Sequence, residues 1–299
     1  MVAFIDEHRN VYGVEPICRQ LPIATSTYYE HKACQACPER RSDRARQDAV
    51  LKQRIKVAWE DSFRVYGARK IWHQLRREGF SVARCTIERL MRKLSIQGVR
   101  RGACRRTTRP APTAVCPADR VQRQFSADRP NRLWVADFTY VPTHSGFVYT
   151  AFVIDVFAKR IVGWRTDRSM GTALVLDALE QALHARTDRD GLIHHSDRGI
   201  QYLSVRYTRR LTEAGVDGSV GSVGNSYDNA LAESIIGLYK AEVIGRQGPW
   251  RTASQVEYAT LVWVDWFNHR RLLSSIGYVP PAELEAGYYQ QLVSQTLAA

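Results

Sequence analysis

The spacing of the apolar residues changes near residue 131, and this change limits the folds that the chain can adopt. Before that point apolar residues recur every three or four positions, which is the period of an amphipathic helix. After it come three segments rich in Val, Ile, Phe, Tyr and Trp, at residues 133–141, 147–157 and 160–166. Short turns separate these segments, and the pattern predicts three strands in a meander. We therefore expect a helical region followed by a domain that contains a sheet.

The remainder of the chain alternates between helical and extended patterns. Helices are expected at residues 172–185, 205–214, 228–244 and 254–271, and strands at residues 191–195 and 216–220. Three consecutive strands followed by alternating helices and strands indicate a mixed sheet with helices packed against it, which is an α/β arrangement.

Residues 1–40 predict a short helical segment. Two helices, at residues 14–21 and 26–32, flank a proline, and Ser26 or Thr27 is expected to cap the second helix. Two helices joined by a tight turn are consistent with a helix-turn-helix and equally with an ordinary helical hairpin.

Residues 41–99 predict three further helices. The third, at residues 83–95, carries an apolar stripe on one side and basic residues on the other: Ile87, Leu90, Met91 and Leu94 against Arg89, Arg92 and Lys93. A helix with this pattern fits a groove of DNA, while a charged face is also the usual solvated face of a helix.

The net charge of +13 is unevenly distributed and favours the DNA interpretation. Residues 1–130 hold 27 Lys and Arg against 13 Asp and Glu, a net +14, and the remaining residues hold 16 against 17, a net −1. Residues 100–128 form a basic, proline-containing linker, which can follow a phosphate backbone or act as a flexible tether; its first arginines are Arg100, Arg101, Arg105 and Arg106. Because Lys and Arg gain by replacing the counterions of phosphates, this half predicts a nucleic-acid partner.

The remaining compositional features point to a cytoplasmic protein. The longest apolar run contains Asp155 and is too short for a membrane span, and the N-terminus lacks the pattern of a secretory signal. Six dispersed cysteines fit a reduced compartment. Cys34 and Cys37 lie near His8 and His31, but the histidines do not have the paired spacing of a zinc site, so we expect no zinc there.

Three acidic residues stand in positions that suit catalysis. Asp137 interrupts an apolar strand, Asp197 follows the end of a strand, and Glu233 lies on a helix. Taken singly they have ordinary explanations: a buried acid held by hydrogen bonds, a turn former and a solvent-facing helix residue. Taken together, three carboxylates can hold two Mg²⁺ ions for an in-line displacement at phosphorus. Lys240 follows Glu233 by two helical turns, so the two share a face on which a DNA phosphate can be held.

Several motifs carry a resemblance to a known family. They are WVADFTY at 134–140, HSDRGIQY at 195–202, SYDNALAE at 226–233, WFNHRR at 266–271 with Pro280 and Pro281 after it, and, upstream, VYGARK at 65–70 with TIERLM at 86–91. With these motifs the chain resembles the transposases of bacterial insertion sequences, specifically the second reading frame of the insertion-sequence-3 family. The 35 residues between Asp197 and Glu233 match the spacing that defines the carboxylate signature of this family.

The resemblance implies a fold and a set of site residues. It implies an RNase H-like integrase catalytic core over residues 129–290, preceded by an all-α helix-turn-helix domain over residues 41–99. It implies that Asp137, Asp197 and Glu233 are catalytic and bind Mg²⁺, with Mn²⁺ as a substitute, and that Lys240 contacts DNA.

The resemblance also implies a reaction and partners. Nicking at the element ends frees a 3′-hydroxyl, which then attacks DNA, and the enzyme acts as a homo-oligomer on double-stranded DNA in the bacterial nucleoid. In this family the active enzyme is often a frameshift fusion with an upstream-frame protein. A metal-dependent nuclease of the same fold and a non-catalytic DNA-binding regulator remain alternatives.

Overall fold

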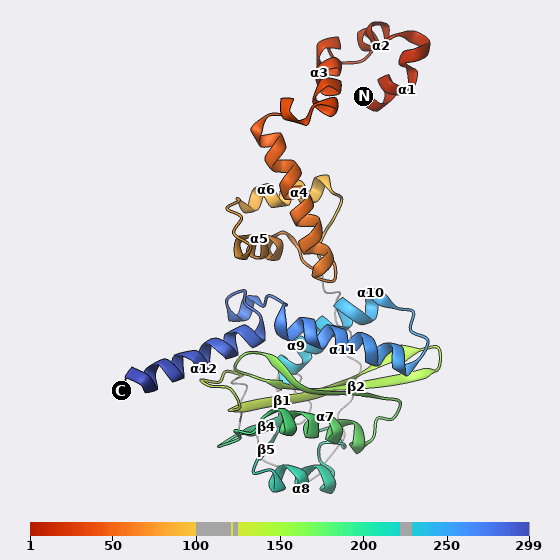
Figure 1. Cartoon of the computed structure of the whole chain (residues 1–299). Helices are drawn as coiled ribbons and strands as arrows, with labels where there is room; N and C mark the ends of the chain where they lie inside the picture. The colour runs from red at the N-terminus through yellow and green to blue at the C-terminus, as the bar shows by residue number, and fades with distance from the viewer. Residues whose placement is uncertain (100–120, 122–124, 222–228, 299) are drawn as a thin grey trace.

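A helical N-terminal half precedes a five-stranded sheet domain, as Figure 1 shows from red to blue. The computed structural model describes residues 1–99, 121, 125–221 and 229–298. Its N-terminal helices are α1 (Val2–Tyr12), α2 (Val14–Gln20), α3 (Thr25–Ala36), a 3₁₀ turn η1 (Pro38–Arg40), α4 (Asp43–Asp61), α5 (Ala68–Arg77) and α6 (Arg84–Lys93).

The first three helices form a small unit with its own apolar cluster. Ile5, Ile17, Cys18 and Tyr28 are buried in it. The two predicted helices are confirmed as α2 and α3, whereas α1 was missed, because Ile5 is its one buried residue and no apolar stripe marks it. The predicted cap is wrong: Ala24 occupies the cap position of α3 and makes no side-chain cap bond.

Helices α4–α6 confirm the three helices expected after residue 41. Each turns an apolar side inward, with Ile55 of α4, Ile71 and Leu75 of α5, and Ile87 and Leu90 of α6 buried. The break after α5 falls at Gly79, whose φ of 87° lies in the left-handed region that glycine adopts readily.

The sheet has the strand order β3-β2-β1-β4-β5 and is mixed. Strands β1 (Leu133–Thr143), β2 (Gly146–Asp155) and β3 (Arg160–Asp167) form the predicted antiparallel meander. Strands β4 (Ile193–Ser196) and β5 (Asp217–Val220) are parallel to β1 and lie beyond its other edge.

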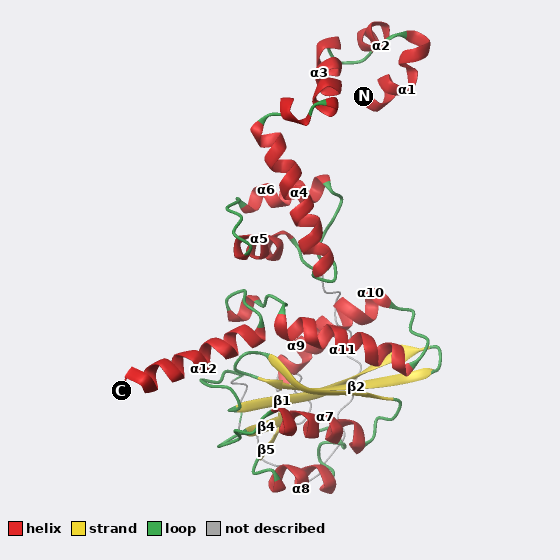
Figure 2. Cartoon of the chain, in the orientation of Figure 1, coloured by secondary structure: helices red, strands yellow, loops and turns green. Residues whose placement is uncertain are grey.

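Helices cover both faces of the sheet, as Figure 2 shows in red against yellow. On one face α7 (Thr172–Ala185) packs on β2 and β3, and α8 (Val205–Glu213) packs beside α7. On the other face lie α9 (Ala230–Tyr239), a π-helical turn (Lys240–Ile244), α10 (Gly245–Gln247) and α11 (Ala253–His269). The expected mixed sheet flanked by helices is confirmed.

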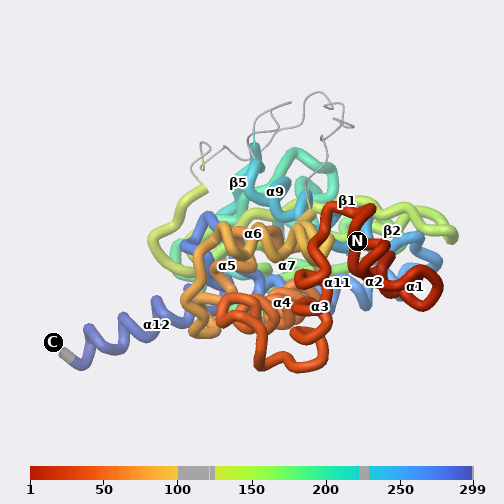
Figure 3. The backbone as a smooth tube through the Cα atoms, turned by 90° about the horizontal axis from the view of Figure 1, so that it is seen from above, coloured from red at the N-terminus to blue at the C-terminus, as the bar shows by residue number. Residues whose placement is uncertain are grey.

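The end of the chain differs from the prediction. The 3₁₀ turn η4 (Ser274–Ile276) leads into α12 (Pro281–Ala298), a helix that the sequence did not predict. Figures 1 and 3 both show α12 leaving the body of the domain with the C-terminus at its tip. Across the ranges that the structure describes, no helix is long and apolar enough to cross a membrane.

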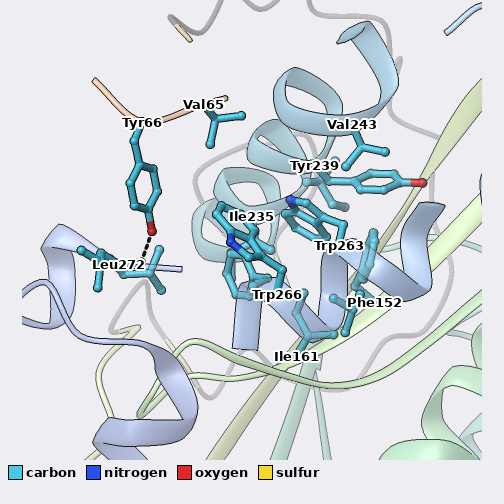
Figure 4. Packing of buried hydrophobic residues seen from close by; sticks show 14 of the residues in the cluster. Val65, Tyr66, Phe152, Ile161, Ile235, Tyr239, Val243, Trp263, Trp266 and Leu272 are labelled. Atoms are coloured by element: carbon cyan, nitrogen blue, oxygen red, sulfur yellow. Dashed lines mark hydrogen bonds between the residues drawn. The ribbon is translucent and has the colours of Figure 1, made fainter. Parts of the chain in front are cut away.

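The region of α4–α6 contacts the sheet domain through residues of α11 and of the segment after it. The Tyr66 hydroxyl accepts a hydrogen bond of 2.6 Å from the backbone N–H of Leu272 (Figure 4). The Tyr66 ring also packs against Trp266, with centroids 5.9 Å apart. His73 of α5 stacks on Tyr278 at 3.7 Å. As a result, one continuous apolar cluster runs from α4–α6 to the α9 and α11 face of the sheet.

Candidate active site

The parallel pairing of β1 and β4 brings two of the predicted carboxylates together. Ala136 of β1 lies opposite Ser196 of β4, so the next residues, Asp137 and Asp197, are neighbours where β4 ends. The carboxyl ends of parallel strands are where active sites form in α/β sheets. The pairing of β1 with β4 thus brings together two residues that lie 60 positions apart in the sequence.

Asp137 is half-buried on β1. Its Oδ1 accepts a hydrogen bond of 2.8 Å from the N–H of Phe138. Burial and then the neighbouring Asp197 carboxylate raise the pKa of Asp137 well above its usual range, and Glu233 acts in the same direction. The Phe138 N–H and Lys240 oppose this rise. The other two carboxylates of the predicted triad and the predicted lysine therefore all act electrostatically on Asp137.

Asp197 begins a tight turn after β4. Its Oδ1 accepts a hydrogen bond of 3.1 Å from the N–H of Gly199. A side chain at residue 199 would place a Cβ 3.1 Å from that oxygen, so glycine allows the turn to close on the carboxylate. The surrounding protein removes part of the solvation of Asp197 and raises its pKa, while the Gly199 N–H and then His195 lower it.

Glu233 lies exposed in the first turn of α9. The helix buries Ala232, Ile235 and Ile236 against the domain, which leaves Glu233 on the other side. Asn229, just before α9, is buried, and its Nδ2 donates a hydrogen bond of 2.8 Å to the carbonyl oxygen of Ala136. This bond ties the start of α9 to the residue before Asp137. Asn229 was not among the predicted site residues, although asparagine at the start of a helix is itself a signal.

Lys240 opens the π-helical turn that continues α9. Its Nζ lies 5.4 Å from the centroid of the Tyr140 ring on β1. The turn is anchored by Glu242, which is buried and accepts hydrogen bonds from Arg271 Nε at 3.0 Å and from Trp263 Nε1 at 3.1 Å. The expected regular helix through residue 244 is therefore wrong at this point, because the Glu242 contacts hold a wider turn. π-Helical turns occur frequently at functional sites.

Buried polar atoms near Asp137 have no hydrogen-bond partner among the described residues. They are Thr139 Oγ1, Tyr202 OH and Asn229 Oδ1. Buried polar atoms are nearly always paired, so atoms without a protein partner mark places for water or a bound group. Within the same part of the chain, no three His, Cys, Asp or Glu side chains are close enough to ligate one ion. The donor set, carboxylates with mutual repulsion, is the type that Mg²⁺ takes.

Comparison with known proteins identifies the family. The integrase core domain family matches residues 127–226, with a second match over 214–281, and the HTH-like domain family matches residues 45–103. The transposase for insertion sequence element IS629 of Shigella sonnei is 55% identical over 299 residues, which are 100% of both chains. This chain belongs to the insertion-sequence-3 family of transposases.

Other relatives of this transposase family are similar over almost the full length. The putative transposase for insertion sequence element IS986/IS6110 of Mycobacterium tuberculosis is 55% identical over 276 residues, 91% of this chain and 98% of that protein. Among solved structures, the HTLV-2 integrase catalytic core domain in complex with magnesium has 15% identity and a TM-score of 0.43, covering 53% of this chain and 98% of that one.

The residues predicted to bind DNA in this transposase family member have different surroundings. Arg89 forms a bidentate ion pair with Asp48 of α4, in which Nη1 and Nη2 donate to Oδ2 at 2.8 Å and to Oδ1 at 2.7 Å. Its guanidinium is therefore paired within the protein. Arg92 and Lys93 are exposed at the end of α6. The four linker arginines lie outside the described residues: Arg100, Arg101, Arg105 and Arg106.

The histidines and cysteines have ordinary contacts. His194 Nε2 lies 3.1 Å from the Tyr207 hydroxyl, and His195 Nδ1 lies 2.9 Å from Ser219 Oγ, with both rings buried. Cys34 Sγ lies 3.4 Å from a carboxylate oxygen of Glu30.

Proposed function

We propose that this transposase nicks DNA at the ends of its insertion sequence and joins the freed strand to other DNA through Asp137, Asp197 and Glu233. The observation that carries the proposal is the register that makes Asp137 and Asp197 neighbours at the end of β4. Glu233 supports it from α9, because its charge acts on Asp137.

Carboxylates are the ligand type that a divalent-metal centre of this kind takes. Bound Mg²⁺, for which Mn²⁺ can substitute, would supply charge stabilisation at phosphorus and an activated oxygen, and two ions would serve the attacking and leaving oxygens. Asp137 and Asp197 would hold the ions from the sheet, and Glu233 from α9. The Asn229 hydrogen bond ties the start of α9, the helix that carries Glu233, to β1.

Each chemical step exchanges one bond for another. In nicking, a water oxygen bonds to phosphorus and the P–O3′ bond breaks, which leaves a 5′-phosphate and a free 3′-hydroxyl. In joining, that 3′-hydroxyl bonds to another phosphorus, and a second 3′-hydroxyl departs with the proton. Lys240, whose charge acts on Asp137 and whose Nζ lies 5.4 Å from the Tyr140 ring centroid, would hold the phosphate of the terminal nucleotide.

The partners and parts of the protein follow from this proposal. The substrate is double-stranded DNA, both element ends and target, held by a homo-oligomer in the cytoplasm at the nucleoid, with an upstream-frame protein or fusion as a further partner. We divide the chain into a helical segment (1–40), a helix-turn-helix-like domain (41–99), a basic linker (100–128) and the catalytic core (129–290). Arg89, Arg92 and Lys93 are the proposed contacts of the second part, and Arg89 would have to leave Asp48 to reach DNA.

The test uses labelled duplexes that carry the element's own end sequences, incubated with the full chain and Mg²⁺. Products longer than the substrate, absent with Asp137→Asn, establish joining through this site. Nicked products without joined ones indicate a metal-dependent nuclease. Binding without metal-dependent products indicates a DNA-binding regulator.

A further inference from the structure

Two aromatic side chains are exposed on the β1–β2 hairpin near the candidate site. Tyr140 is 44% exposed and Phe147 is 57% exposed. Tyr140 pairs with Tyr149 in the antiparallel ladder, and Phe147 lies two residues from Tyr149, so the two exposed rings are diagonal neighbours on one face. Their centroids lie 5.6 Å apart, and their planes meet at 89°. The edge of one ring therefore points toward the face of the other.

The position of Tyr140 connects this pair to the candidate site. Tyr140 lies three residues after Asp137 on the same strand, and the Lys240 ammonium lies 5.4 Å from its ring centroid. Lys240 also acts electrostatically on Asp137. An exposed aromatic ring therefore lies beside the lysine that is predicted to contact DNA, three positions along β1 from Asp137.

The packing of the hairpin does not account for these exposed rings. Phe138 and Tyr149, on the same face, are half-buried against the cluster formed with α7, whereas Tyr140 and Phe147 remain exposed. Exposing two large rings forgoes the burial that normally stabilises aromatic residues in strands. A ligand that combines a flat ring with a negative charge matches both the rings and the lysine.

We propose that the Tyr140 ring, with Phe147 packed edge-to-face against it, stacks on one unpaired nucleobase at the DNA end, while Lys240 neutralises the phosphate of that nucleotide. The base is unpaired because a base inside a duplex has both faces covered by its neighbours, whereas a splayed terminal base offers a free face. This inference rests on the proposed function and assigns positioning residues for the same site.

The test is a binding measurement in metal-free buffer, so that it does not depend on chemistry. The full chain binds pre-nicked end duplexes in which 2-aminopurine replaces each of the last three bases in turn. With the wild-type protein and with Tyr140→Phe, stacking on the ring quenches the fluorescence at one position. With Tyr140→Ala we expect no quenching at that position and a Kd about tenfold higher, as for the loss of one base–aromatic stack. Phe147→Leu should give a smaller increase.

A matched control and a matched substrate separate stacking from general damage. Tyr258→Ala removes another exposed tyrosine ring, 69% exposed, from α11 and should leave both readouts unchanged. On a duplex with an abasic site at the quenched position, wild type and Tyr140→Ala should bind equally, because the base that the ring holds is gone.

Three outcomes would overturn the proposal. If Tyr140→Ala quenched the fluorescence as strongly as the wild-type protein does, the ring would not touch a base. An equal loss of affinity on the abasic duplex would indicate a purely structural role. A loss of oligomer in sedimentation, with quenching retained, would indicate that the rings contact a second copy of the chain. Failure of the proposed function appears separately, as the absence of joined products from the wild-type protein with Mg²⁺.

Discussion

Asp155 and Asp137 lie on neighbouring strands of the same sheet, and their carboxylates differ in the hydrogen bonds that they accept. Asp155, at the end of β2, is fully buried and accepts hydrogen bonds from the N–H groups of Asn131 at 2.6 Å and Phe157 at 2.9 Å. Burial raises its pKa, and the Asn131 N–H and the nearby Arg186 oppose that rise. Each carboxylate oxygen of Asp155 therefore has a hydrogen-bond donor.

The carboxylate of Asp137 has fewer hydrogen-bond donors among the described residues than that of Asp155. Asp137 accepts one N–H, from Phe138, and faces two other carboxylates, Asp197 and Glu233. The unpartnered atoms of Thr139 and Tyr202 lie in the same region, as judged from the described residues. An acid within a sheet thus indicates a site only when its surroundings leave charge and hydrogen-bonding capacity unsatisfied.

The largest expected difference concerns activity. Asp137→Asn, Asp197→Asn or Glu233→Gln should each lower the rate of strand joining by at least roughly 10³-fold, since each removes a charge that would hold metal at the reacting phosphate. Gel assays with labelled end duplexes measure this, with filter binding as the control for retained DNA affinity. Full joining activity in all three variants would rule out the site.

The second difference concerns stability. Asp155→Ala leaves two buried N–H groups without an acceptor and should cost about 3 kcal/mol of unfolding free energy, with a Tm lower by roughly 6–12 °C. Joining activity per folded molecule should stay within about twofold of wild type. Denaturant and thermal unfolding measure the loss. If activity disappeared while stability was retained, Asp155 would belong to the catalytic site.

The third difference concerns metal. At a Mg²⁺ concentration of about 100 Kd, the ion should stabilise the wild-type protein by about 2.7 kcal/mol, since it binds the folded state and not the unfolded one. Asp137→Asn should gain much less. Thermal unfolding in Mg²⁺ and in EDTA compares them. Equal gains in both proteins would place the ion somewhere other than Asp137.

The smallest difference concerns pH. In EDTA the pKa of folded Asp137 lies above the ordinary value of 3.8, so the folded state holds the proton more tightly than the unfolded state does. Its contribution is favourable at low pH and is lost as pH rises from about that ordinary value through the raised pKa. Asp137→Asn should lack this decline. Unfolding free energies over a pH series test it, and parallel profiles for the two proteins would contradict it.

The sequence predicted the parts of the fold that depend on local pattern. The helix Thr172–Ala185 has the predicted bounds, because its apolar spacing is continuous and its ends lie in polar turns. Asp137 and Asp197 could be singled out because one interrupts an apolar strand and the other ends a strand. Their adjacency required the β1–β4 register, which no local pattern contains.

Other features depend on contacts between distant residues and could not be predicted. The pairing of Arg89 with Asp48 spans 41 positions and follows from the packing of α6 on α4. The wide turn at Lys240 contains Glu242, whose partner Arg271 lies 29 positions further along the chain. Helix α12 was missed because its apolar residues are largely exposed and form no clear stripe facing the domain.

The π-helical turn at Lys240–Ile244 has a consequence for insertions and deletions. A π turn holds one residue more than an α turn, so the segment behaves as a one-residue insertion within an otherwise regular helix. Deleting Ala241 would restore regular winding and leave the helices on either side in phase. Lys240 and Glu242 would then be consecutive residues, pointing about 100° apart around the helix axis. A length change of one residue there would rotate the lysine relative to Glu242 and so move it from its position beside the Tyr140 ring.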